Sequence, residues 1–143
     1  MKIPITKFKN QDFINMSNMN SELMKQFNET MKLVAARYED QVRLFPGFVH
    51  IPDEVALTFD DIYRALPQLK YDLSGRAVAL IDELNNMFSM MSEDKAFWTL
   101  EKMKNDVTWS VTRRLAKDIL HETGQDIELP KMNFVTWPGY VKG

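Results

Sequence analysis

Apolar residues recur at steps of three and four along most of this chain, which is the period of an α-helix with one buried side. The first such run begins at Asn10, a residue type that favours the N-cap position, and continues to Phe45. Pro46 and Gly47 end the run, because proline cannot continue the backbone hydrogen bonds and glycine permits a turn. A second start at residues 20–21 would divide the run, so the pattern leaves open whether it forms one helix or two.

The middle of the chain predicts one short helix. Residues 48–54, with the sequence FVHIPDE, are expected to be extended. Thr58, with Asp61 three residues later, resembles a capping box and predicts the start of a helix. That helix should be short because Pro67 interrupts it.

The second half of the chain predicts two long helices. Ser74 is expected to cap a helix that runs to Met91. Ser92 is expected to start another that continues to about Glu122, before Gly124 as a C-cap. Together with the earlier segments, this pattern predicts an all-α fold, a small helical bundle of three long helices and one short one.

Apolar residues also lie outside the predicted helices, at both ends of the chain. Prolines in these ends favour extended backbone over helix. We therefore expect a single domain over residues 1–143, with an extended N-terminal arm over 1–9, the bundle over 10–124 and an extended C-terminal arm over 125–143. A fully buried aromatic side chain contributes about 2–3 kcal/mol, so the arms should pack either on their own bundle or on neighbouring subunits.

Charge is distributed unevenly between the body and the ends. The chain has a net charge of −2, but residues 10–128 carry 13 basic and 20 acidic side chains, a net charge of −7. The two ends outside that range carry five lysines and no acidic residue. Basic, apolar arms on an acidic body suit contacts with neighbouring acidic surfaces.

Composition excludes several classes of protein. At 143 residues, with 45% hydrophobic and 27% charged residues, the chain has the composition of an ordinary globular domain. The absence of cysteine excludes disulfides, thiol catalysis and thiolate metal sites. Neither a membrane span nor the apolar core of a signal peptide is visible, so we expect a soluble, cytoplasmic protein, or a virion protein if the source is a phage.

No catalytic or metal-binding motif stands out, and we expect no enzyme activity and no cofactor. His121 lies at the predicted end of the last helix, where a cation is favoured. Asp118 precedes it by three residues, a spacing found in helical metal sites, but the sequence lacks the two Glu-x-x-His motifs that a di-iron bundle needs. The acidic residues occur as adjacent pairs, which diverge on a helix instead of converging on a metal ion. A magnesium-dependent all-α nucleotide hydrolase is therefore an alternative hypothesis only. The pairs are 39–40, 53–54, 60–61, 82–83 and 93–94.

Nucleic-acid binding is not expected either. Arg113, Arg114 and Lys117 form a local basic strip on the last predicted helix, but acidic residues are interspersed among them. The acidic body would repel a phosphate backbone. The sequence favours a solvated helix face with local ion pairs.

The apolar arms and a methionine cluster favour a non-catalytic assembly protein. We expect it to form a homo-oligomer or a subunit of a larger complex, with a phage connector, neck or tail component as the favoured kind. The alternative is a helical regulator or inhibitor that binds a host enzyme. Methionine suits adaptable binding surfaces, so the cluster at 87–91 joins the arms as a predicted contact. The predicted partner-binding residues are Ile3, Ile5, Phe8, Phe48, Met87, Met90, Met91, Phe134, Trp137 and Tyr140.

Overall fold

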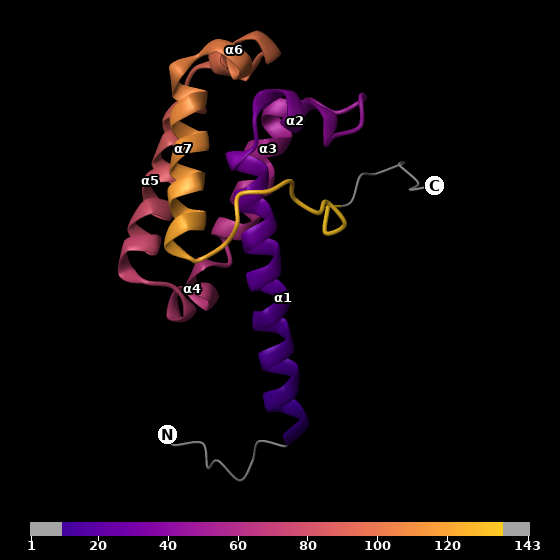
Figure 1. The fold of residues 1–143 in the computed structure, drawn as a ribbon, viewed down its shortest axis with the longest axis vertical. Coiled ribbons are helices and arrows are strands. Elements are labelled where there is room, and N and C mark those ends of the chain that lie inside the picture. The colour runs from indigo at the N-terminus through magenta and orange to yellow at the C-terminus, as the bar shows by residue number, and fades with distance from the viewer. Residues whose placement is uncertain (1–9, 136–143) are drawn as a thin grey trace.

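The computed structural model describes residues 10–135, and this part of the chain is all-α (Figure 1). No strand occurs between residues 10 and 135, so the predicted all-α class is confirmed. The helices are α1 (Asn10–Ala35), α2 (Tyr38–Arg43), α3 (Ile51–Tyr63), α4 (Leu66–Leu69), α5 (Gly75–Met91), α6 (Leu100–Asn105) and α7 (Val107–Glu122), with 3-10 turns η2 (Lys70–Asp72) and η3 (Lys95–Trp98).

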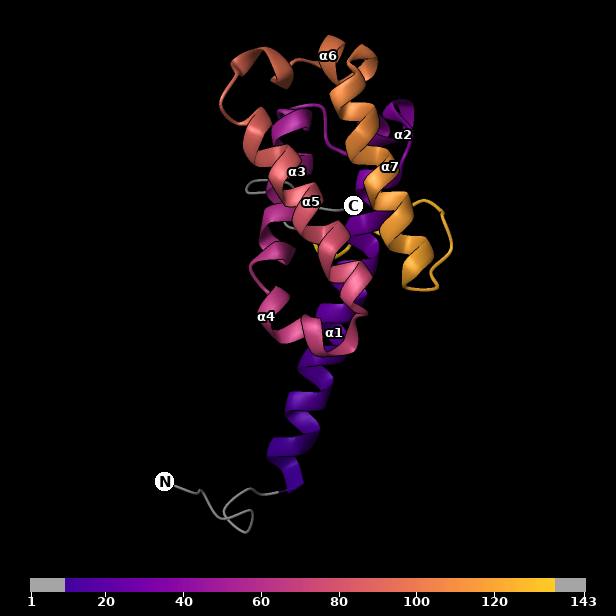
Figure 2. The same cartoon turned by 90° about the vertical axis from the view of Figure 1, so that its left-hand side faces the viewer.

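The four longest helices form an antiparallel bundle. They run alternately up and down, so that α1 packs against α3 and α7, while α5 packs against the same two helices (Figure 1). The short helices α2, α4 and α6 connect them at the two ends of the bundle (Figure 2). This arrangement places a shared apolar core between the four helices. Of the neighbouring pairs among these four helices, α3 and α5 pack least closely, which leaves a seam between them.

Helix α1 is longer than the bundle it belongs to. Its N-terminal half projects beyond the other helices (Figures 1 and 2). Among the residues whose side chains are described, contacts of α1 with the core begin at Leu23, and Phe27, Met31 and Val34 are buried. The helix is continuous through residues 20–21, which answers the question that the sequence pattern left open.

Aromatic side chains form the centre of the core. Trp109 of α7 is fully buried, and its ring meets the edges of Phe88 at 6.0 Å and Trp98 at 5.7 Å between centroids. Its indole N–H donates to the Phe97 carbonyl at 2.8 Å, so the buried polar atom is satisfied. Phe59 of α3 continues the cluster at 5.3 Å from Phe88. Helices α3, α5 and α7 and turn η3 therefore share one aromatic centre.

The predicted first helix divides into two helices, which corrects the expected end at Phe45. Helix α1 ends at Ala35 and α2 begins at Tyr38. The buried Gln41 side chain stabilises this break, because its amide donates to the carbonyls of Leu33 and Val34 at 3.1 Å each. These bonds satisfy carbonyl groups that the end of a helix leaves without partners.

The start of the second helix was predicted wrongly. Residues 51–54 are helical, and α3 begins at Ile51 with Pro52 in its first turn, where the missing N–H costs nothing. Asp53 and Glu54 add negative charge beside the helix N-terminus. Thr58 is not a cap but lies within the helix, and its hydroxyl donates to the Glu54 carbonyl at 2.7 Å.

The predicted helix from Ser92 to Glu122 is also several elements. Ser92 is the C-cap of α5 and not a start. Asp94, Thr99 and Asp106 then each accept a backbone N–H at the start of η3, α6 and α7. Three caps close together divide this region, and the prediction of three long helices and one short is replaced by seven α-helices between residues 10 and 135.

Two predicted helix ends are confirmed. The Ser74 hydroxyl accepts the Ala77 N–H at 3.0 Å, so this residue caps α5 as expected. Gly124 follows α7 with φ +72°, a left-handed conformation that favours glycine. Its N–H donates to the His121 carbonyl, and the N–H of Gln125 reaches the Leu120 carbonyl, which together form a C-capping motif.

Candidate functional site

The described part of the predicted C-terminal arm, residues 125–135, packs on its own chain. It leaves α7 and crosses α1 (Figure 1). Pro130 is buried, and Met132 packs against the core. Phe134 and Val135 lie beside Thr30 of α1 and Ile62 of α3, where they line a hollow of about 340 Å³.

Buried Lys32 of α1 holds this segment in place. Its Nζ donates to Glu128 Oε1 at 2.7 Å and lies 3.7 Å from Glu29 Oε1. Glu29 also accepts the backbone N–H of Lys131 at 2.9 Å. The hydrogen bond from Lys32 lowers the pKa of Glu128, and the same bond raises the pKa of Lys32. One buried cation therefore links α1 to the segment through two carboxylates.

We expect Glu128→Gln to loosen residues 125–135 without unfolding the bundle. The carboxylate favours the attached state above its unfolded pKa, and that preference is lost as pH falls through its depressed folded pKa, because protonation removes the charged partner of Lys32. Hydrogen exchange of the Lys131 amide should therefore become faster in the variant, and in the wild-type protein as pH falls below about 4.5, after correction for intrinsic rates.

The matched control for this change is Glu101→Gln, an exposed acidic residue on α6. Unchanged exchange at Lys131 in Glu128→Gln would show that the ion pair does not hold the segment.

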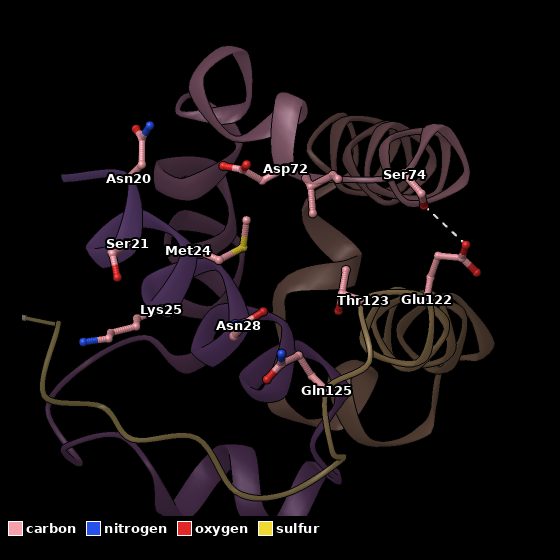
Figure 3. Close-up of a pocket in the computed structure, with 11 residues that line it drawn as sticks. Asn20, Ser21, Met24, Lys25, Asn28, Asp72, Ser74, Glu122, Thr123 and Gln125 are labelled. Atoms are coloured by element: carbon pink, nitrogen blue, oxygen red, sulfur yellow. Dashed lines mark hydrogen bonds between the residues drawn. The ribbon is translucent and has the colours of Figure 1, made fainter. Parts of the chain in front are cut away.

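A polar hollow of about 740 Å³ lies where α1 leaves the bundle (Figure 3). Asn28 of α1 lies between Met24 and Gln125 in this view. Among the described side chains, its Oδ1 is the one buried nitrogen or oxygen atom without a hydrogen-bond partner. Ser74 caps α5 and also donates to Glu122 at 3.3 Å, so a structural role accounts for both contacts of its hydroxyl. The hollow can hydrogen-bond a polar group.

A second, apolar groove lies along the seam between α3 and α5. Its volume is about 510 Å³, and Phe59, Phe88 and Trp98 contribute aromatic surface to it. Asp53 and Asp60 stand at its α3 edge. We call this site the α3–α5 groove. Its apolar lining and acidic edge suit a partner that is both apolar and basic.

The predicted partner-binding residues fall in different environments. Phe48 is 63% exposed and Met90 is 48% exposed, whereas Met87 is partly buried against the core. Phe134 is partly buried where the C-terminal segment meets α1 and α3. The remaining predicted contacts, Ile3, Ile5, Phe8, Trp137 and Tyr140, lie outside the described residues.

Met91 does not belong to an exposed surface. It is fully buried in the core at the end of α5, and its carbonyl accepts the Trp98 indole N–H at 2.9 Å. The sequence suggested that methionines at 87, 90 and 91 nearly encircle the helix end. Met91 follows Leu84 by seven residues and Phe88 by three, so it continues the buried side of α5, whereas Met90 lies off that side.

Acidic residues form local contacts in the region that the structure describes. No group of three His, Asp or Glu residues there is placed to hold a metal ion. One member of each adjacent acidic pair has a nearby partner: Asp40 binds Arg37 and Arg43, Asp53 binds His50, Asp60 binds Arg64, Asp82 accepts from Tyr63, and Asp94 caps η3.

Arg113 is not part of a solvated basic strip. Its guanidinium donates to Gln41 Oε1 at 3.1 and 3.2 Å and to the Met103 carbonyl at 2.6 Å. Burial lowers its pKa. The side chain therefore joins α2, α6 and α7, and it is unavailable to a phosphate backbone. Arg114 and Lys117 of the predicted strip are both exposed on α7.

The chain matches no protein-family model, and neither a curated protein nor a solved structure matches it. Across residues 10–135, no helix has both the length and the apolar character needed to cross a membrane. Geometry and residue chemistry therefore carry the functional conclusion.

Proposed function

We propose that this protein is a non-catalytic assembly protein that docks on neighbouring subunits through its terminal segments. The observation that carries the proposal is the projecting N-terminal half of α1 (Figures 1 and 2). A phage connector, neck or tail component is the kind of assembly that we favour.

The projecting half of α1 extends beyond the helices that pack on its other half. Most helical stability in proteins comes from tertiary packing of one face, so a partner on this half would stabilise it. The bundle does not cover this half, and residues 1–9 at its tip add Ile3, Ile5 and Phe8 with three lysines. A neighbouring subunit would bury these side chains and stabilise the helix at the same time.

The described C-terminal segment, unlike the projecting half of α1, packs on its own chain. Residues 125–135 already pack on α1 and α3 of their own chain, anchored by Lys32 and Glu29. Of the two ends, the N-terminal one is therefore the better candidate for contacts between subunits.

The hydrolase alternative gains no support from the acidic pairs. A helix cap, a hydrogen bond or local ion pairs account for one residue of each, and metal-ion catalysis would need several carboxylates directed at one point.

Deleting residues 1–9 should reduce oligomer formation and leave the melting temperature of the bundle within a few degrees of the full chain. The reason is that the deletion removes the docking side chains but none of the described core. Light scattering after size-exclusion chromatography, together with thermal unfolding, measures both effects.

The matched control deletes residues 136–143, which removes a similar number of residues, also apolar and lysine-bearing, from the other end. An unchanged oligomeric state after deletion of residues 1–9 would contradict the assignment of docking to the N-terminal arm.

A further inference from the structure

The α3–α5 groove is a built apolar surface that the described chain leaves open. Phe59 and Phe88 line it but are only 1% and 7% exposed, so its accessible apolar surface comes mainly from the partly buried Trp98 and from Leu57, which is 55% exposed at the edge. Exposed apolar surface of this kind, bordered by polar residues, is characteristic of an interaction site.

Two acidic residues line the α3 edge of the groove. Asp53 and Asp60 keep 49% and 41% of their side chains exposed, and each also contacts a neighbour close in the sequence, His50 at 2.6 Å and Arg64 at 2.9 Å respectively. Residues 51–98, which contain both helices, carry nine acidic and four basic side chains, a net charge of −5. A partner for this surface should therefore combine apolar side chains with positive charge.

One segment of the chain has that composition. Residues 1–9, MKIPITKFK, contain Ile3, Ile5 and Phe8 together with Lys2, Lys7 and Lys9, and no acidic residue. Residues 136–143 match less well, with a single lysine. The C-terminal segment also reaches α3 on the side that faces α1, beside Thr30 and Ile62, and not from the side of α5.

The geometry of α1 prevents the arm from reaching the groove of its own chain. Ile3 precedes Asn10 by seven residues, which span at most about 25 Å when fully extended. The helix from Asn10 to Phe27 is itself about 25 Å long. A fully extended arm folded back along α1 would therefore end near Phe27, on the side of α3 that faces α1, whereas the groove lies between α3 and α5.

We propose that the α3–α5 groove binds the N-terminal arm, residues 1–9, of a second copy of this chain. The inference rests on the proposed function and names the acceptor for the docking arm. The apolar residues of the arm pack on Leu57 and Trp98, above the buried rings of Phe59 and Phe88, and its lysines approach Asp53 and Asp60. Because the donor arm and the acceptor groove are different surfaces, each copy can give one arm and receive another, which builds rings or open chains.

Because the natural chain has no cysteine, disulfide trapping can test this contact directly. Thr6→Cys places one thiol in the arm, and Ser89→Cys places one in an exposed position that lines the groove. The two full-length single-cysteine variants are mixed and oxidised mildly. Peptide mass spectrometry then identifies the disulfide that joins position 6 of one variant to position 89 of the other, which in this mixture forms only between two molecules.

The matched acceptor control is Ser110→Cys, an exposed serine on α7 that does not line the groove. We expect the disulfide between positions 6 and 89 to form at least about tenfold faster than the one between positions 6 and 110, because docking raises the local thiol concentration. This difference between the two rates of disulfide formation should decrease when Asp53→Asn and Asp60→Asn are combined. It should also decrease at high salt, where exposed charges are screened.

The outcomes separate the two proposals. Oligomers that form without preferential trapping between positions 6 and 89 would overturn the groove as acceptor and leave the assembly function standing. A protein that neither oligomerises nor traps would overturn both. Rapid closure of the disulfide within one molecule of a Thr6→Cys/Ser89→Cys double variant, without a dimer, would overturn the assignment to a second copy.

Discussion

Replacing Trp109 with alanine should lower the free energy of unfolding by about 3–5 kcal/mol, the usual cost of removing a large buried aromatic side chain. Trp109 is fully buried and contacts the rings of Phe88 and Trp98. Its loss leaves a cavity where α5, α7 and η3 meet. The Phe97 carbonyl also loses the N–H that it accepts at 2.8 Å. Chemical denaturation followed by circular dichroism measures the change.

Trp109→Phe separates the two parts of that effect. The smaller ring keeps much of the apolar packing but cannot donate a hydrogen bond, so we expect a smaller loss than for alanine. The exposed Leu100 on α6 provides a surface control, and Leu100→Ala should change stability by no more than about 0.5 kcal/mol. A loss below about 1 kcal/mol for Trp109→Ala would contradict the placement of this residue at the centre of the core.

Replacing Gln41 with leucine should lower the free energy of unfolding by about 3 kcal/mol, because several buried polar groups lose their partners at once. The carbonyls of Leu33 and Val34 lose the donor that caps α1. The guanidinium of Arg113 loses one of its two acceptors and keeps only the Met103 carbonyl. A buried charge with incomplete hydrogen bonding is costly in a low-dielectric interior.

A double variant tests whether Gln41 and Arg113 act together. When Arg113→Met is added to Gln41→Leu, the combined loss should be smaller than the sum of the two single losses, since the second change removes the unpaired charge. Gln68→Leu on α4 makes the same substitution at an exposed position and should be nearly neutral. Additive losses in the double variant would show that the two side chains are energetically independent.

Local signals predicted the parts of the fold that depend on neighbouring residues. The Ser74 cap and the Gly124 C-cap are read from a few consecutive residues, and both are confirmed. The apolar period also identified several buried positions on α5 and α7, such as Ile81 and Leu115, but not Trp109. The period works best on α5, where one side of the helix faces the core.

Breaks between helices were predicted less well, because they depend on contacts that the apolar pattern does not show. The end of α1 at Ala35 is stabilised by a side chain six residues later, Gln41, which itself binds a residue of α7. An apolar pattern that continues across residues 36–37 conceals this break. The early start of α3 could have been found, since Pro52 followed by two acidic residues is a recognised helix-start signal.

The candidate sites were predicted only in part. Sequence spacing could have separated Met91 from Met90, because Met91 continues the buried positions Leu84 and Phe88 of α5 and Met90 does not. It cannot show that Arg113 is turned inward toward Gln41. The α3–α5 groove combines residues that are about 30 positions apart, and only the fold brings Asp60 and Phe88 to one surface. Charge segregation between the arms and the body, in contrast, is visible in the sequence alone.

The native mass of the intact protein in solution tests the central claim most directly. Multi-angle light scattering over a range of concentrations should give a mass that rises to a multiple of the 16.7 kDa chain. A constant mass of 16.7 kDa up to about 0.1 mM, where contacts of micromolar affinity would be occupied, would contradict docking between copies of this chain.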